Sequence, residues 1–143
     1  MNLPELFAEE ITREGALTRR TLERVPEGRD DWQPHDKWMP LGRLAVMIAG
    51  MPSWLTMMVE KEDFDLDPPG GGSSFMPEIK SNADLLSALV AGHVVSEKPR
   101  HVMIRESFNH LAHHRGQLTV YLRLNDVAVP AIYGPSADDQ RFE

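Results

Sequence analysis

The chain has 143 residues and a formal net charge of −7, and hydrophobic residues make up 41% of it. These values predict one globular domain over residues 1–143 and argue against the clustered basic surface that nucleic-acid binding requires. The chain has no cysteine, which excludes disulfides, cysteine-ligated zinc and a thiolate nucleophile of the protein's own. With neither a leader pattern nor an apolar run of membrane-spanning length, we expect a cytoplasmic protein that does not contact membranes.

The first predicted helix runs from about residue 3 to residue 24, and Pro4 suits its first turn. Gly15 interrupts the apolar stripe that should face the core. The members of this stripe are Leu3, Leu6, Phe7, Ile11, Leu22 and Val25.

The loop that follows, residues 28–40, contains two tryptophans and a histidine. We interpret Trp32 and Trp38 as anchors that hold the loop against the helices. Ligand binding by these two rings is the alternative. His35, between them, is predicted to form structural hydrogen bonds.

The second predicted helix covers residues 41–61 and has two neighbouring apolar stripes. A face this broad indicates burial against more than one partner helix. Pro52 should either kink this helix or begin a second helical piece. One stripe consists of Leu44, Met47, Met51, Trp54 and Met58, and the other of Leu41, Ala45, Ile48, Leu55 and Val59.

A linker rich in proline and glycine, residues 64–77, is predicted to precede a short third helix over about residues 81–95. The fourth helix is predicted from Pro99 to Leu124, and Asn125 should end it in the left-handed conformation. The tail, residues 127–143, is interpreted as an extended, partly ordered strap. The predicted core positions of the fourth helix are Val102, Ile104, Phe108, Leu111, Leu118, Val120, Leu122 and Leu124.

The predicted fold class is all-α, because four helices joined by loops indicate an antiparallel, up-down-up-down four-helix bundle. The third helix is shorter than the fourth, so part of the fourth lacks a neighbouring helix. We expect the strap or a second copy of the chain to cover that part.

Three of the six histidines lie within one predicted helical run, residues 109–117. His110 and His114 are four residues apart and therefore share one face of the helix, where two imidazoles can hold one transition-metal ion. Gln117 lies on the same stripe. A chance pair of surface histidines is the alternative that the spacing alone leaves open.

The chain resembles the DinB-like family of small metal-binding four-helix bundles, in particular the branch with the same ending. The resemblance rests on several segments that occur in the same order along the chain. They are Trp32-Gln33-Pro34-His35-Asp36-Lys37, Leu41-Gly42-Arg43-Leu44-Ala45, Phe108-Asn109-His110, His113-His114-Arg115-Gly116-Gln117-Leu118, residues 121–127, and Tyr133-Gly134-Pro135-Ser136-Ala137-Asp138-Asp139.

The resemblance implies a divalent metal, nickel or zinc, held by three histidines. Two of them fall on His110 and His114, and the third falls on position 47 of the second helix, where this chain has Met47. A thioether suits Cu(I) and is a poor ligand for Zn²⁺ or Ni²⁺, so we interpret Met47 as a core residue. Replacement of the lost ligand by His93 or His101 is a less favoured alternative.

Four further residues near the pair have predicted roles. Gln117 is predicted to orient a metal ligand or a bound water, or to form an interhelix hydrogen bond. Tyr121 is predicted to line the pocket or to pack. His113 should face solvent, a loop or a partner subunit, and Arg115 should pair with an Asp or Glu of a neighbouring helix.

Two functions follow from the resemblance. The first is a metal-dependent enzyme, either a hydrolase or a thiol S-transferase that takes bacillithiol, mycothiol or another low-molecular-weight thiol as cosubstrate. The second is a non-catalytic, dimeric binding or stress-associated scaffold whose metal site has decayed at Met47. Both interpretations include a homodimer, and neither includes nucleic acid as a partner.

Overall fold

A computed structural model describes residues 3–60 and 101–141 of the protein. Within these residues there are three helices, α1 (Leu3–Leu22), α2 (Leu41–Glu60) and α4 (His101–Leu124), and no strand. The all-helical class is confirmed for this part of the chain. The predicted linker and third helix lie outside the described residues. None of the described helices is long and apolar enough to cross a membrane.

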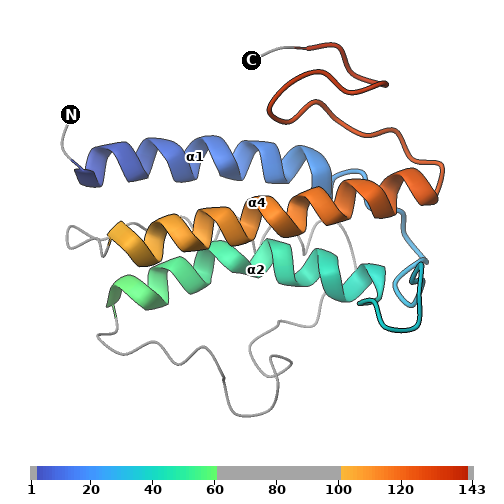
Figure 1. The fold of residues 1–143 in the computed structure, drawn as a ribbon, viewed down its shortest axis with the longest axis horizontal. Helices are drawn as coiled ribbons and strands as arrows, with labels where there is room; N and C mark the ends of the chain where they lie inside the picture. Colours follow the sequence, from blue (N-terminus) through green and yellow to red (C-terminus); the bar gives the residue numbers. More distant parts are fainter. Residues whose placement is uncertain (1–2, 61–100, 142–143) are drawn as a thin grey trace.

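The direction of α4 differs from the prediction. Figure 1 shows α1 and α4 running the same way, with α2 running opposite to both. The contacts between α1 and α4 agree with a shared direction. Phe7 stacks on Phe108 near the start of the two helices, and Glu14 contacts Arg115 further along both. The up-down-up-down order is therefore wrong. It assumed that each helix in the chain reverses the direction of the one before it, whereas 40 residues, 61–100, separate α2 from α4, and a separation of this length does not require such alternation.

The described core lies where α1, α2 and α4 meet. Both predicted stripes of α2 are buried as far as its side chains are described, which explains why this helix needs partners on two sides. Three apolar residues predicted for the core are instead about half exposed, namely Leu6, Val120 and Leu124. The buried cluster consists of Leu22, Val25, Leu41, Leu44, Ala45, Met47, Ile48, Ala49, Met51, Leu111, Leu118, Tyr121 and Leu122.

Helix α2 continues through Pro52 without a second start. A proline at this position lacks the N–H that would donate to the carbonyl of Ile48. Ser53 donates its hydroxyl to the Gly50 carbonyl across 2.6 Å one turn earlier. The predicted second helical piece is therefore not formed.

The loop between α1 and α2 is held by its aromatic residues, as predicted. Trp32 meets the ring of Tyr121 edge-on at 5.6 Å between centroids, and Trp38 stacks on the same ring at 6.0 Å. The Tyr121 hydroxyl donates to the Met39 carbonyl across 2.7 Å. His35 accepts a hydrogen bond from the Lys37 backbone N–H, as its structural role required. The tryptophans thus anchor the loop to α4.

The end of α4 is a Schellman motif, with the left-handed residue one position later than predicted. The Val127 N–H donates to the Leu122 carbonyl, and the Asp126 N–H donates to the Arg123 carbonyl. Asp126, and not Asn125, has a positive φ of 58°. Either side chain tolerates this conformation, so composition alone did not choose between them.

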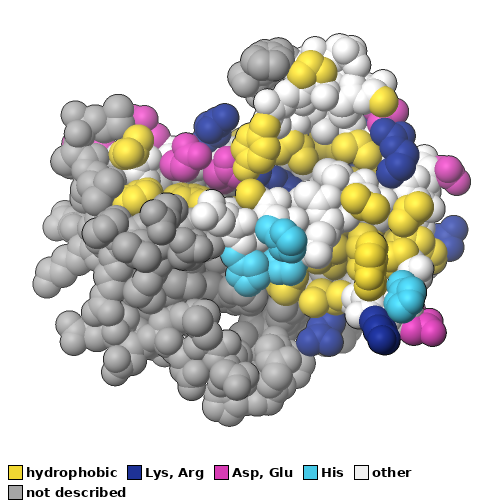
Figure 2. Space-filling model, viewed as in Figure 1, with side chains coloured by type: hydrophobic (Ala, Val, Ile, Leu, Met, Phe, Trp, Pro, Cys, Tyr) yellow, Lys and Arg dark blue, Asp and Glu magenta, His cyan; other side chains and the backbone are white. Residues whose placement is uncertain are grey.

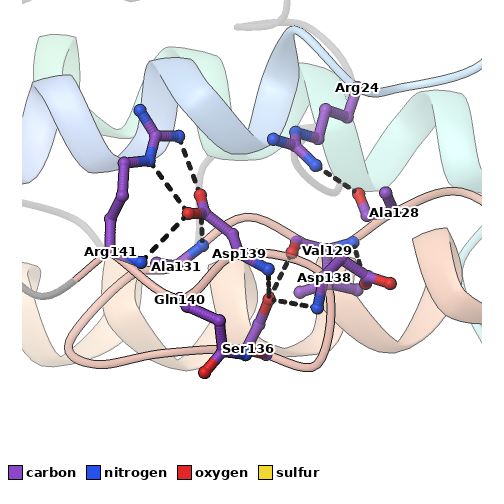
Figure 3. A network of polar contacts seen from close by, with 9 residues as sticks. All are labelled: Arg24, Ala128, Val129, Ala131, Ser136, Asp138, Asp139, Gln140 and Arg141. Carbon is purple, nitrogen blue, oxygen red and sulfur yellow. Dashed lines mark hydrogen bonds and ion pairs between the residues drawn. The ribbon is translucent and has the colours of Figure 1, made fainter.

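The C-terminal segment, residues 127–141, has no regular element and folds back on itself. Figure 3 shows its central contact, where Ser136 donates to the Val129 carbonyl across 2.6 Å. The carboxylate of Asp139 accepts from the Ala131 N–H and from Arg141. Arg24, two residues after the end of α1, donates to the Ala128 carbonyl. The predicted extended strap is therefore a folded loop fastened to α1.

A buried ion pair joins α1, α4 and the C-terminal segment. Arg115 donates to the Glu14 carboxylate across 2.6 Å, to the Glu14 carbonyl and to the Thr18 hydroxyl. The Tyr133 hydroxyl accepts from Arg115 and donates to Glu14. The predicted pairing of Arg115 with an acid of a neighbouring helix is confirmed. Among the described residues no buried side-chain nitrogen or oxygen lacks a partner.

Candidate metal centre

The site lies midway along α4, where two imidazoles one turn apart point at each other. The four-residue spacing places His110 and His114 on the same face, and their Nε2 atoms are 2.8 Å apart. Figure 2 shows histidine side chains gathered near the middle of one face, next to a hydrophobic patch. Side-chain contacts therefore support the predicted pairing of these two rings.

This separation matches adjacent positions around one metal ion. Two metal–nitrogen bonds of about 2.0–2.1 Å that meet at a right angle hold their nitrogens about 2.9 Å apart. A tetrahedral angle requires about 3.3 Å, which a small movement of either ring supplies. Imidazole nitrogen suits zinc and nickel. The chemistry and spacing of this pair thus fit two positions of a divalent site.

Gln117 contacts the ring nitrogen of His114 that does not face His110. Its Oε1 atom is 2.6 Å from Nδ1 of His114, one turn further along the helix. A carbonyl oxygen accepts hydrogen bonds, so this contact favours a proton on Nδ1 and a lone pair on Nε2. The predicted role of Gln117 as an orienting residue has a geometric basis, whereas no interhelix hydrogen bond of Gln117 is observed among the described contacts.

The pKa values of both histidines are lowered. Partial burial is the main cause for each ring. The positive form of His113 adds to the decrease at His110, and at His114 the contact with Gln117 opposes it. A lower pKa keeps more of each ring neutral near neutral pH, which is the form that binds metals.

No third ligand accompanies the pair among the side chains that the structure describes, those of residues 5–53 and 107–141. Within this set no three residues of the His, Cys, Asp and Glu types gather closely enough to hold one metal ion. His113 is exposed and meets the ring of His114 edge-on, as its position off the shared face predicted. His93 and the side chain of His101 lie outside the described residues.

Met47 belongs to the buried core cluster, with a relative exposure of 7%. The other members of that cluster are hydrophobic side chains, most of them from α2 and α4, and this environment suits a thioether as packing. The interpretation of Met47 as a core residue is consistent with this placement.

Tyr121 lies two turns past His114 on α4. Its side chain is buried, its hydroxyl donates to the Met39 carbonyl, and both tryptophans of the loop contact its ring. Burial raises the pKa of this hydroxyl. Of the two predicted roles, packing accounts for each of these contacts.

Glu14 and Tyr133 were not predicted as the partners of Arg115. A signal was present, because Glu14 lies three residues after Ile11 and three before Leu17 on the face of α1 that turns inward. An acid within a buried stripe requires a basic partner. Tyr133 carried no such signal, since it comes from an irregular segment.

Comparison with known families supports the resemblance over part of the chain. Residues 98–141 match the DinB family. The match includes α4 with its histidine pair and Gln117, and the C-terminal segment that fastens to α1. It covers 44 of the 143 residues and does not extend to α2 and Met47. No curated protein matches the chain.

Proposed function

We propose that the protein is a DinB-like metalloprotein in which His110 and His114 hold a divalent ion, nickel or zinc. The observation that carries this proposal is the 2.8 Å approach of the two Nε2 atoms on a helix that matches the DinB family. The same approach is compatible with a hydrogen bond between the two rings when no ion is bound. A divalent ion bound by both Nε2 atoms would replace that hydrogen bond.

The reaction class that follows is metal-dependent hydrolysis or thiol transfer. When bound, a divalent ion supplies a Lewis acid that lowers the pKa of a water or thiol. The chain has no cysteine, so a thiol nucleophile has to come from a low-molecular-weight cosubstrate. His110 and His114 would bind the ion, Gln117 would orient His114, and the exposure of Gln117 would leave the pair open to a small substrate.

A specific observation favours a second candidate function, a scaffold without catalysis. Met47 stands where the resemblance places a third histidine, and it is packed in the core. Two protein ligands hold an ion more weakly than the three that catalytic zinc sites use. In this case the bundle would act by binding a partner.

The deciding experiment measures the metal content of untagged protein by elemental mass spectrometry. We would compare wild type, the double variant His110→Ala with His114→Ala, and Met47→His. His35→Ala is the matched control, because His35 is also exposed but lies in the tryptophan loop. Thermal melts with added Ni²⁺ or Zn²⁺ give a second readout, since a ligand of the native state stabilises it.

Metal in wild type and in the His35 variant, with none in the double variant, would support the metalloprotein. A wild type that contains no metal, and whose melting temperature does not change with added Ni²⁺ or Zn²⁺, would contradict it. If the Met47→His variant then contains metal, the scaffold function is favoured, because only the third ligand was missing.

We also propose that the protein forms a homodimer. Val120 and Leu124, four residues apart on α4, are 48% and 55% exposed, which gives this helix an apolar strip beyond its packing inside the protomer. Light scattering behind a sizing column would measure the mass. Val120→Lys should give a monomer if this strip forms the interface.

A further inference from the structure

The orientation of one amide determines where the protons lie in the histidine pair. Gln117 presents Oε1 to Nδ1 of His114 at 2.6 Å. Since an amide oxygen only accepts, the hydrogen of this bond belongs to Nδ1. A neutral imidazole carries one proton, so Nε2 of His114 then has a lone pair directed at His110.

The short distance to His110 has a second consequence. Two nitrogen lone pairs 2.8 Å apart repel each other, so a proton or a cation has to lie between them. In the metal-free protein that proton has to be carried by Nε2 of His110, because Nδ1 of His114 already holds the other ring's proton. The two histidines therefore have unequal roles although they share one helix face.

We infer that Gln117 is a positioning residue that fixes the proton of His114 on Nδ1 and so makes His110 the carrier of the proton between the rings. Binding of a divalent ion by both Nε2 atoms would require His110 to release this proton from Nε2. His114 needs no change of tautomer to bind the ion. This last step rests on the proposed function, whereas the tautomer assignment concerns the metal-free protein.

Two substitutions of similar length separate the chemistry of Gln117 from its bulk. Gln117→Glu keeps an oxygen acceptor and removes the donor, and Gln117→Met removes both. The control is Asn109→Ala, an exposed polar residue on the same helix. His113→Ala helps to assign the ring signals.

The primary measurement is the long-range proton–nitrogen NMR spectrum of the histidine rings, in metal-free protein at about pH 8. We expect His114 as the Nδ1–H form in wild type, Gln117→Glu and Asn109→Ala, and a mixture of both forms in Gln117→Met. His114 as the Nε2–H form in wild type would overturn the inference, since the amide would then be turned the other way. An unchanged spectrum in Gln117→Met would overturn it as well.

The second measurement is the affinity for Ni²⁺ and Zn²⁺ by calorimetry. Loss of an orienting partner of a metal-bound histidine lowers affinity about 10–100-fold. We expect this decrease in Gln117→Met and little or none in Gln117→Glu. An equal decrease in both variants would count against the acceptor role. If the expected tautomers are found and no variant binds either ion, the tautomer assignment stands and the proposed function fails.

Discussion

Arg115 of α4 and Glu14 of α1 form an ion pair of 2.6 Å whose two residues are 0% and 3% exposed. The pair is tolerated in the interior because Thr18, the Glu14 carbonyl and the Tyr133 hydroxyl supply further hydrogen bonds to it. The attraction within such a buried ion pair stabilises the fold less than the removal of one partner destabilises it. The reason is that the remaining charge would be buried without a partner.

Replacement of one partner should therefore destabilise the protein strongly. We expect Arg115→Ala to lower the free energy of unfolding by about 3–5 kcal/mol. The control is Arg123→Ala, which breaks an exposed pair with Asp138 and should cost about 0–1 kcal/mol. Urea denaturation followed by circular dichroism measures both. Equal losses in the two variants would mean that burial of the pair has no energetic consequence.

The stability of the protein should fall at alkaline pH through Tyr133. Burial raises the pKa of Tyr133 to about 12, Arg115 opposes the rise and Glu14 adds to it. Because the folded pKa lies above the ordinary value, the neutral hydroxyl contributes stability that is complete below about pH 10 and lost as the pH passes 12. Thermal melts between pH 9 and 12 should show a steeper decline in wild type than in Tyr133→Phe. Parallel curves would refute this linkage.

Two glycines of α2 should respond to alanine with opposite signs. At Gly42 a Cβ atom would lie 2.9 Å from the Cβ of Asp30, while the Gly42 N–H donates to the Asp30 carbonyl. We expect Gly42→Ala to destabilise the protein by about 1–3 kcal/mol. At Gly50 nothing lies within 4 Å of the added atom, so Gly50→Ala should stabilise by about 0.5–1 kcal/mol. Chemical denaturation of the two variants tests the pair, and two changes of the same sign would contradict it.

A substitution of Tyr121 can distinguish a packing role of this residue from a role in the metal site. Removal of its hydroxyl in Tyr121→Phe deletes the hydrogen bond to the Met39 carbonyl, and we expect a loss of about 1 kcal/mol in stability. Metal affinity should not change, because the contacts of this hydroxyl lie in the tryptophan loop. A decrease in Ni²⁺ or Zn²⁺ binding without a loss of stability would instead assign Tyr121 to the pocket.

Local features of the fold could be predicted from the sequence. Helical periodicity located α1, α2 and α4 to within about two residues at most ends, and the four-residue spacing predicted that His110 and His114 would meet. The anchoring of the loop by Trp32 and Trp38 also followed from composition. Each of these depends on neighbours within a few turns of the chain.

Relationships between distant segments could not be predicted in the same way. The shared direction of α1 and α4 depends on the course of a long connection, and no local pattern encodes it. The exposure of Val120 and Leu124 depends on which side of α4 has a neighbour. The folded C-terminal segment is built from single contacts of Ser136, Asp138 and Asp139, and each becomes meaningful only once its partner is known.

The buried charge also constrains the order in which the protein can be completed during synthesis. Glu14 leaves the ribosome 101 residues before Arg115, and the Tyr133 hydroxyl follows 18 residues after that. Until then the acid that faces the interior of α1 has no base to meet, so dehydration of that face is opposed. We therefore expect the inward face of α1 to reach its final packing only after Arg115 and Tyr133 have both been synthesised.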